Sequence, residues 1–110
     1  MDLELTIINI INFSGEARSF CMEAIGYVKS GESKKARDAM EEANNKLSEA
    51  HKSQTLLIQE EARGEGKPIS LLLVHAQDHL MNAITVRDMA NEFIELYQII
   101  EELRGERNHG

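Results

Sequence analysis

Apolar and small side chains recur along the chain at alternating steps of four and three residues, the spacing that lines one face of an α-helix. Between residues 3 and 28 the recurring positions are Leu3, Ile7, Ile10, Ser14, Ala17, Cys21, Ala24 and Val28. Between residues 34 and 63 they are Ala36, Met40, Ala43, Leu47, Ala50 and Leu57. The pattern predicts two amphipathic helices, and the alanines of the second favour close packing against a neighbour.

Glycine and proline interrupt this pattern at only two places. Gly31 predicts the end of the first helix, with Ser33 as the N-cap of the second. The segment Gly-Glu-Gly-Lys-Pro at 64–68 predicts the end of the second helix, and a third should follow from Ile69 or Ser70 to about residue 103. Three helices of similar length joined by short turns predict an all-α, antiparallel three-helix bundle.

The predicted third helix carries two apolar seams. One runs through Ala76, Leu80, Ala83, Ala90, Ile94 and Tyr97. The other runs through Val86, Met89, Phe93, Leu96, Ile100 and Leu103. Because each seam needs a partner, this helix should pack within its own chain on one side and against other copies of the chain on the other, as a homo-oligomer. Residues 105–110 are polar and are predicted to form a tail beyond a single domain spanning 1–104.

Composition narrows the class of protein. The 110 residues carry a net charge of −7, which disfavours a nucleic-acid partner because phosphate binding needs clustered basic residues. The only cysteine, Cys21, falls on the seam of the first helix and is predicted to be a core residue in a reducing compartment. The sequence has neither an apolar run long enough to span a bilayer nor a signal-peptide pattern, so we expect a cytoplasmic protein.

The strongest chemical signal is a polar stripe within the third helix. Its members, spaced by three and four residues, are His75, Asp78, His79, Asn82 and Thr85. Burying such a group without a partner costs about 1–3 kcal/mol, so the stripe indicates either a function or unseen partners. The remaining histidines give weaker signals, because His51 lies in a polar stretch and His109 in the tail.

His75, Gln77, Asp78 and His79, in this order on one helix, resemble the lactose/cellobiose-type enzyme IIA proteins of the sugar phosphotransferase system, and the resemblance extends from about Asp2 to Arg104. It implies that His75 accepts a phosphoryl group on Nε2 from the histidine-containing phosphocarrier protein. His75 would then pass the group to a cysteine of the cognate IIB component during uptake of a β-disaccharide. The sequence leaves the sugar open among lactose, cellobiose and chitobiose.

The chemistry of histidine agrees with this reading, because a neutral imidazole is a nucleophile near neutral pH. On a helix, Nδ1 of His75 is predicted to reach a carbonyl one turn back, near Leu71, which would leave Nε2 free. Gln77 and His79 are predicted to support the phosphohistidine. The alternative is that His75 is a hydrogen-bonded histidine inside a helical interface.

For Asp78 the resemblance implies a position on the threefold axis of a homotrimer, where three copies share a structural metal ion, Mg²⁺ in our prediction. Three buried carboxylates repel one another unless a cation or protons neutralise them, and octahedral Mg²⁺ accepts monodentate carboxylates and waters. The alternative is an ordinary surface carboxylate or a partner of His75.

Two further classes remain open at this stage. In one, His75, Asp78 and His79 are metal ligands of a helical bundle, although Ala76 rules out the His-Glu-x-x-His motif of metalloproteases. In the other, the chain is a structural trimer whose polar layer fixes the register of its helices. No glycine-rich phosphate-binding loop with lysine is present, which argues against direct use of ATP.

Overall fold

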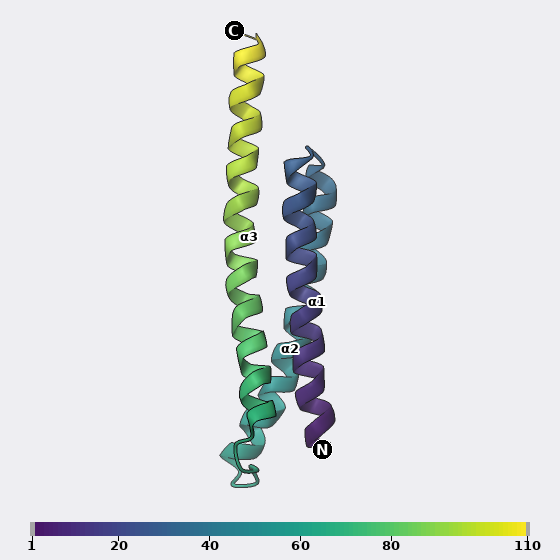
Figure 1. Cartoon of the computed structure of the whole chain (residues 1–110), viewed down its shortest axis with the longest axis vertical. Coiled ribbons are helices and arrows are strands. Elements are labelled where there is room, and N and C mark those ends of the chain that lie inside the picture. The colour runs from purple at the N-terminus through teal and green to yellow at the C-terminus, as the bar shows by residue number, and fades with distance from the viewer. Residues whose placement is uncertain (1, 110) are drawn as a thin grey trace.

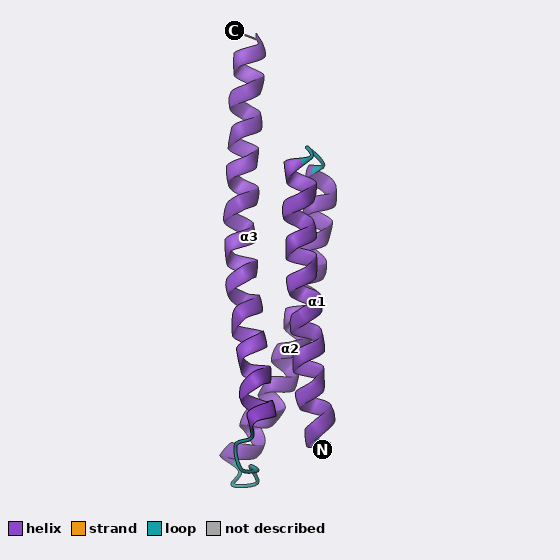
Figure 2. Cartoon of the chain, in the orientation of Figure 1, coloured by secondary structure: helices purple, strands orange, loops and turns teal. Residues whose placement is uncertain are grey.

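The computed structural model describes residues 2–109, and the side chains of residues 2–106. It consists of α1 (Leu3–Lys29), α2 (Ser33–Ala62) and α3 (Leu71–His109), with no strand in the described part (Figures 1 and 2). Successive helices run in opposite directions and form a rod of 66 × 20 × 16 Å (Figure 1). The predicted all-α, antiparallel three-helix architecture is therefore confirmed.

Both helix–helix turns depend on a glycine with positive φ. Gly31 has a φ of 78°, and the backbone N–H of Glu32 donates to the carbonyl of Tyr27 at 2.9 Å. Gly64 repeats this conformation after α2, with a φ of 77°. L-residues with a Cβ disfavour this region, which explains why glycine stops each helix. The predicted N-cap of α2 is wrong by one residue: Ser33 is already helical, and Glu32 occupies the cap without a side-chain hydrogen bond.

The core follows the predicted seams. Its buried apolar members are Ile7, Ile10, Ala17, Cys21, Ala24, Val28, Ala36, Ala39, Met40, Ala43, Leu47, Ala50, Ala76, Leu80, Ala83 and Ala90. α1 packs along both other helices, whereas α2 and α3 meet over few residues. Removing this apolar surface from water supplies the main favourable term in folding, and the many alanines let the helices approach closely.

The third helix is longer than predicted. With 39 residues it spans about 58 Å, and its C-terminal end projects beyond the turn between α1 and α2 (Figure 1). It continues through Gly105 to His109, where the sequence predicts a tail. One interior glycine costs a helix only about 1 kcal/mol relative to alanine, and the neighbouring Glu106 and Arg107 are good helix formers. Gly110 and the side chain of His109 lie outside the described part.

One face of α3 has no partner among the described residues of the chain. It follows steps of three and four residues, and we call it the outer stripe: Leu71, Val74, Asp78, Met81, Thr85, Met89, Phe93, Leu96, Ile100 and Leu103. All ten side chains are exposed, including Leu71 at 85% and Leu103 at 58%. The second predicted seam thus lies at the surface of the single chain, apart from the partly buried Val86. None of the three helices, over the described residues, combines the length and apolar content needed to cross a bilayer.

Candidate functional site

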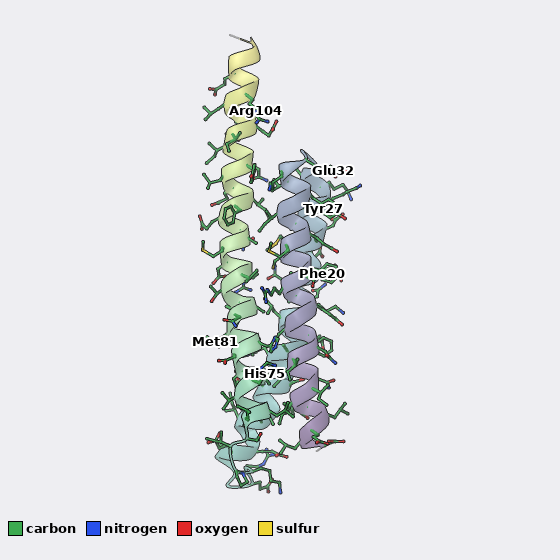
Figure 3. All side chains as sticks on the ribbon, in the orientation of Figure 1. Phe20, Tyr27, Glu32, His75, Met81 and Arg104 are labelled. Atoms are coloured by element: carbon green, nitrogen blue, oxygen red, sulfur yellow. The ribbon has the colours of Figure 1, made fainter. Side chains whose placement is uncertain are left out.

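The start of α3 fixes the positions of all four predicted site residues. Oγ of Ser70 accepts a hydrogen bond at 3.1 Å from the backbone N–H three residues further on, and so caps the helix. His75 and Asp78, one to two turns later, are exposed, while Gln77 and His79 are partly buried. Figure 3 shows His75 on α3, in the half of the rod where all three helices lie together.

His75 and His79 are in direct contact. Their Nε2 atoms lie 3.1 Å apart, and their ring centroids lie 4.5 Å apart with the ring planes at 86°. The spacing of four residues stacks the two side chains on the same side of the helix. A hydrogen bond at this distance needs one protonated and one unprotonated Nε2, so the two imidazoles hold different tautomers when both are neutral.

The predicted bond from Nδ1 of His75 to a carbonyl near Leu71 is wrong for the described residues. No such bond is present, and the ring of His75 instead directs Nε2 towards His79. The hydrogen bond that His75 does form thus joins its Nε2 to the side chain one turn ahead, and not its Nδ1 to the carbonyl one turn back.

Gln77 lies on a different side of α3 from His79. Its Oε1 accepts a hydrogen bond of 2.9 Å from Nε2 of Gln54 on α2. Oε1 of Gln54 in turn lies 3.3 Å from Nδ1 of His51. The exposed His51, in the polar stretch of α2, is thus linked through Gln54 to Gln77 on α3. Sequence reasoning missed Gln54, because the partners are 23 residues apart and only the folded bundle brings them together.

Asp78 is exposed and occupies the outer stripe. Among the described residues it forms no hydrogen bond or salt bridge within the chain, and no cluster of three or more metal-ligating side chains exists there. A single carboxylate cannot hold Mg²⁺ without further ligands. A metal site at Asp78 therefore requires carboxylates from other copies of the chain.

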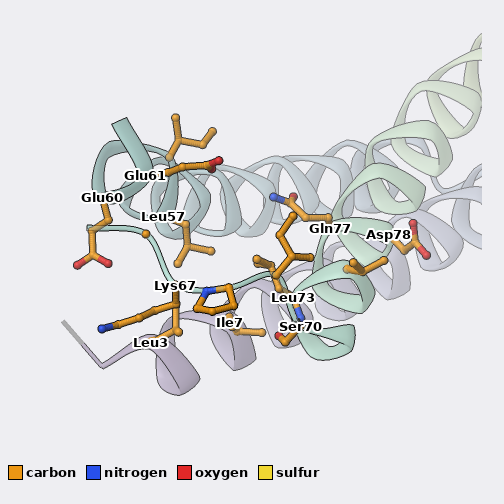
Figure 4. Close-up of a pocket in the computed structure, with 15 residues that line it drawn as sticks. Leu3, Ile7, Leu57, Glu60, Glu61, Lys67, Ser70, Leu73, Gln77 and Asp78 are labelled. Carbon is orange, nitrogen blue, oxygen red and sulfur yellow. Dashed lines mark hydrogen bonds between the residues drawn. The ribbon is translucent and has the colours of Figure 1, made fainter. Parts of the chain in front are cut away.

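Several hollows border these residues, including an open one at the start of α3 that His75 and Asp78 line with Leu71, Leu72 and Val74. At one end of the rod, a cavity of about 350 Å³ lies between α1, α2 and the segment that leads into α3, and Gln77 and Asp78 are at its edge (Figure 4). Its wall is mostly apolar, with Leu3, Ile7, Leu57, Pro68 and Leu73. A second, open hollow lies over α1 and is bordered by Gly15, Ser19, Glu23 and His79. The ring of His79 thus has open space on the α1 side.

Cys21 belongs to the core and not to this site. Its side chain is fully buried between α1 and its neighbours. Burial raises the pKa of the thiol above its ordinary value of 9.0, and the nearby positive charge of Arg87 opposes this shift. A thiol that stays protonated is a poor nucleophile, so the prediction of a structural role is confirmed.

The fold and the histidine pair define a three-helix bundle with an exposed imidazole, that of His75, in contact with a second one. The family model for the lactose/cellobiose-specific IIA subunit of the phosphotransferase system matches residues 5–98. The chain belongs to this family and is a phosphotransferase component of that system. The resemblance seen in the sequence is confirmed.

Relatives in both sequence and structure agree with this assignment. The lichenan-specific IIA component of Bacillus subtilis is 54% identical over 104 residues, which are 94% of each chain. The crystal structure of the cellobiose-specific IIA of Bacillus anthracis matches with a TM-score of 0.89 and 52% identity, over 93% of this chain and 94% of that one. A chain of the Escherichia coli IIA(chitobiose)–HPr complex matches with a TM-score of 0.80 and 37% identity, over 92% and 98%.

Proposed function

We propose that Nε2 of His75 carries the phosphoryl group, accepting it from the histidine-containing phosphocarrier protein and passing it to a cysteine of the cognate IIB component. The observation that carries this proposal is the exposed His75 on α3, in contact with His79, in a chain of the IIA family. The E. coli relative solved in complex with HPr supports the first partner. Membership of the IIA family supports the second.

The chemical step requires a lone pair on His75. The Nε2 lone pair attacks phosphorus, the bond from phosphorus to the donor histidine breaks, and the electron pair returns to the donor imidazole. In the onward step a cysteine thiolate attacks phosphorus and the pair returns to His75. No other covalent chemistry is needed, so the protein contributes positioning and charge stabilisation.

The surroundings of His75 suit partners that bind in turn. Exposed apolar side chains flank it on α3: Leu72 at 39%, Val74 at 46% and Met81 at 57% exposure. Because the same histidine must meet two proteins, each complex must dissociate readily, and we expect small interfaces. The net charge of −7 favours partners with positively charged docking surfaces.

We further propose a homotrimer assembled through the outer stripe, with three Asp78 carboxylates meeting at its axis. Exposed apolar side chains along the whole of α3 support an assembly of several copies. Asp78 is the one charged member of the stripe and has no partner within the described part of its own chain. Three such carboxylates would hold Mg²⁺, which would supply charge neutralisation at the axis and take no part in phosphoryl transfer.

We propose transport of a β-linked sugar and a cytoplasmic location. The relatives named above carry the words lichenan, cellobiose and chitobiose, and a lactose-specific component of Staphylococcus epidermidis is 39% identical over 97 residues, 88% of this chain and 93% of that protein. All these names denote sugars with β-glycosidic linkages. A single buried thiol suits a reducing compartment.

Reconstitution tests the proposal directly. Purified protein incubated with phosphoenolpyruvate, enzyme I and the phosphocarrier should gain one acid-labile, base-stable phosphoryl group per chain. His75→Ala should abolish this gain while the circular dichroism spectrum stays helical, because the exposed side chain adds little to the core. Normal phosphorylation of the His75→Ala protein would contradict the assignment. A wild-type chain that gains no phosphate would point instead to the structural bundle.

A further inference from the structure

The polar contacts that lead from α2 to α3 have a fixed direction. Nδ1 of His51 lies 3.3 Å from Oε1 of Gln54, and Nε2 of Gln54 donates at 2.9 Å to Oε1 of Gln77. An amide oxygen can only accept, so Nδ1 of His51 carries a proton and donates to Gln54. Each group thus donates to the next one towards α3. The NH2 group of Gln77 is the free end, because it forms no hydrogen bond with the described side chains.

These contacts decide which end of the Gln77 amide is presented to the outside. The oxygen and nitrogen ends of an amide have nearly the same shape, so an unconstrained glutamine can present either. Reversing Gln77 alone would bring its NH2 group against the donating Nε2 of Gln54. Reversing both amides would bring the NH2 group of Gln54 against the protonated Nδ1 of His51. Gln77 is therefore held with its oxygen inward and its two N–H donors outward.

His75 and Gln77 flank the outer stripe on opposite sides. Successive residues of a helix are about 100° apart, so these two lie about 80° on either side of the line through Val74 and Asp78. Residues two apart do not face each other, so Gln77 cannot reach His75 of its own chain. Around a threefold axis along the stripe the three α3 helices are parallel, and the Gln77 flank of each faces the His75 flank of the next.

We propose that Gln54 is a positioning residue for phosphoryl transfer: it keeps the NH2 group of Gln77 outward, where it donates to the phosphoryl group on the neighbouring copy's His75. His51 fixes the orientation of Gln54 from behind. This inference rests on the proposed function, both the carrier role of His75 and the trimer. Its structural basis is the 2.9 Å bond between two partly buried glutamines on different helices.

The oriented amide acts on charge and not on the bonds that form and break. Phosphoryl oxygens are anionic, and a hydrogen bond to an anionic oxygen is stronger than one between neutral groups. An amide that already presents its donors needs no reorganisation when the phosphoryl group arrives. A reversed amide would present an oxygen to the same anionic group and repel it. No proton leaves Gln77, so the bonds broken and formed remain those between phosphorus and its carriers.

A purely structural role would make Gln54 only a link between α2 and α3. These helices share another side-chain bond in the described part, which Arg87 donates to Oδ1 of Asn44 at 3.1 Å. It lies about 15 Å further along α3 than Gln77. Asn44→Leu removes that link and leaves Gln77 untouched. It is the matched control for Gln54→Leu, because both variants exchange an amide side chain for an apolar one.

Nitrogen NMR of the full-length protein tests the orientation. At about pH 8, above the ordinary titration range of histidine, wild type should show His51 protonated at Nδ1. The side-chain NH2 resonances of Gln77 should shift when the protein is phosphorylated. Gln54→Glu should abolish this shift, because a carboxylate can only accept and turns the NH2 group of Gln77 inward. A wild-type His51 protonated at Nε2 alone, or an unchanged response of Gln77 in the variant, would overturn the proposal.

The kinetics of phosphoryl acceptance test the consequence for transfer. Gln54→Glu should lower the rate constant about tenfold, less than the loss at a buried oxyanion site because water partly replaces the donor. Gln54→Leu should lower it only about two- to threefold, since Gln77 can then present either end of its amide. The KM for the phosphorylated carrier should change little. Gln59→Glu, which adds the same charge at an exposed position of α2, should react at the wild-type rate.

A double-mutant cycle shows whether Gln54 acts through Gln77. Gln77→Leu removes the donor itself and should slow acceptance about as much as Gln54→Glu. Adding Gln54→Leu to Gln77→Leu should cause no further loss, because the residue that it positions is already gone. Independent, multiplicative losses would contradict a role through Gln77.

The outcomes separate this inference from the proposed function. If wild type accepts phosphate on His75 but Gln54→Glu and Gln54→Leu react at the wild-type rate, the role of Gln54 is wrong and the carrier assignment stands. Equal losses in Gln54→Leu and Asn44→Leu would reduce Gln54 to a structural link. If wild type accepts no phosphate, or is a monomer, the proposed function fails in that part and the inference fails with it. Circular dichroism of each variant distinguishes lost chemistry from lost folding.

Discussion

The two apolar faces of α3 differ in side-chain size and in what covers them. The inner face, with Ala76, Leu80 and Ala83, is at most 2% exposed because α1 lies against it. The outer stripe carries larger residues such as Met81 and Phe93, which are 57% and 44% exposed. Small residues allow two helix backbones to approach within one chain, whereas large ones suit contacts between chains, where many side chains must fill the space.

His75 lies at the border of these two faces. Val74, one residue earlier, belongs to the outer stripe, and Ala76, one residue later, belongs to the core. At this border the imidazole of His75 is exposed to a partner protein. His79, which is partly buried, contacts it from the packed side of the helix. The proposed carrier role of His75 needs both properties, since a nucleophile must be reachable and its tautomer must be fixed.

The largest effect on stability should come from the inner face. Leu80→Ala removes one of the largest fully buried side chains and should lower the free energy of unfolding by about 2–5 kcal/mol. Urea denaturation followed by circular dichroism at one fixed protein concentration measures this loss. Leu56→Ala is the matched control, because Leu56 is 49% exposed on α2 and should change the value by no more than about 0.5 kcal/mol. Equal losses in both variants would contradict the core described here.

A smaller effect on folding, but a decisive one on assembly, is expected from the outer stripe. Leu96→Glu should leave the helical spectrum nearly unchanged and convert the trimer to a monomer, because it places three negative charges together in an apolar contact. Sedimentation equilibrium at micromolar concentration measures the change. Leu56→Glu makes the same substitution outside the stripe and should stay trimeric. A wild type that sediments as a monomer would rule out the proposed assembly.

Much of this architecture follows from residue spacing alone. Steps of three and four residues identified both faces of α3, and glycines placed the ends of α1 and α2, because helix period and positive φ are local properties. The end of α3 was placed too early, since Gly105 weakens a helix without ending it. The residues that follow, Glu106 and Arg107, favour the helix enough for it to continue.

The site, too, has one part that the sequence predicted and another that depends on the folded structure. His75 was predicted as a site residue from its neighbours in sequence. Its hydrogen-bond partner was not predicted, because the choice between a carbonyl behind and a side chain ahead depends on the rotamers within the folded helix. The bond between Gln54 and Gln77 joins residues on two helices and depends on how those helices pack. Atomic detail at the site is thus a property of the tertiary structure.

The smallest expected effect concerns Asp78, which places a charge within the otherwise uncharged outer stripe and so tests what covers that face of α3. If three copies meet at an axis, their repulsion makes the wild-type trimer depend on a cation. Asp78→Leu replaces the charge with an apolar side chain of similar volume, so the trimer should persist, and its stability should be equal or higher by about 1–4 kcal/mol. Thermal unfolding with and without EDTA measures both effects. Wild type should lose stability in EDTA, most clearly above neutral pH, where protons cannot replace the metal.

A control variant shows whether the effect of Asp78→Leu depends on its place at the proposed axis or follows from the loss of any carboxylate. Asp38→Leu removes an exposed carboxylate that, among the described side chains, pairs only with Lys34 on α2, and it should leave the response to EDTA unchanged. Phosphoryl acceptance by His75 should survive Asp78→Leu, because the metal is assigned no part in the chemistry. Dissociation of the Asp78→Leu trimer would contradict the proposed metal site at the axis. A wild-type melting temperature that changes with neither EDTA nor added Mg²⁺ would contradict it as well. Either result would leave the inner face and the histidine pair unaffected, since neither includes Asp78.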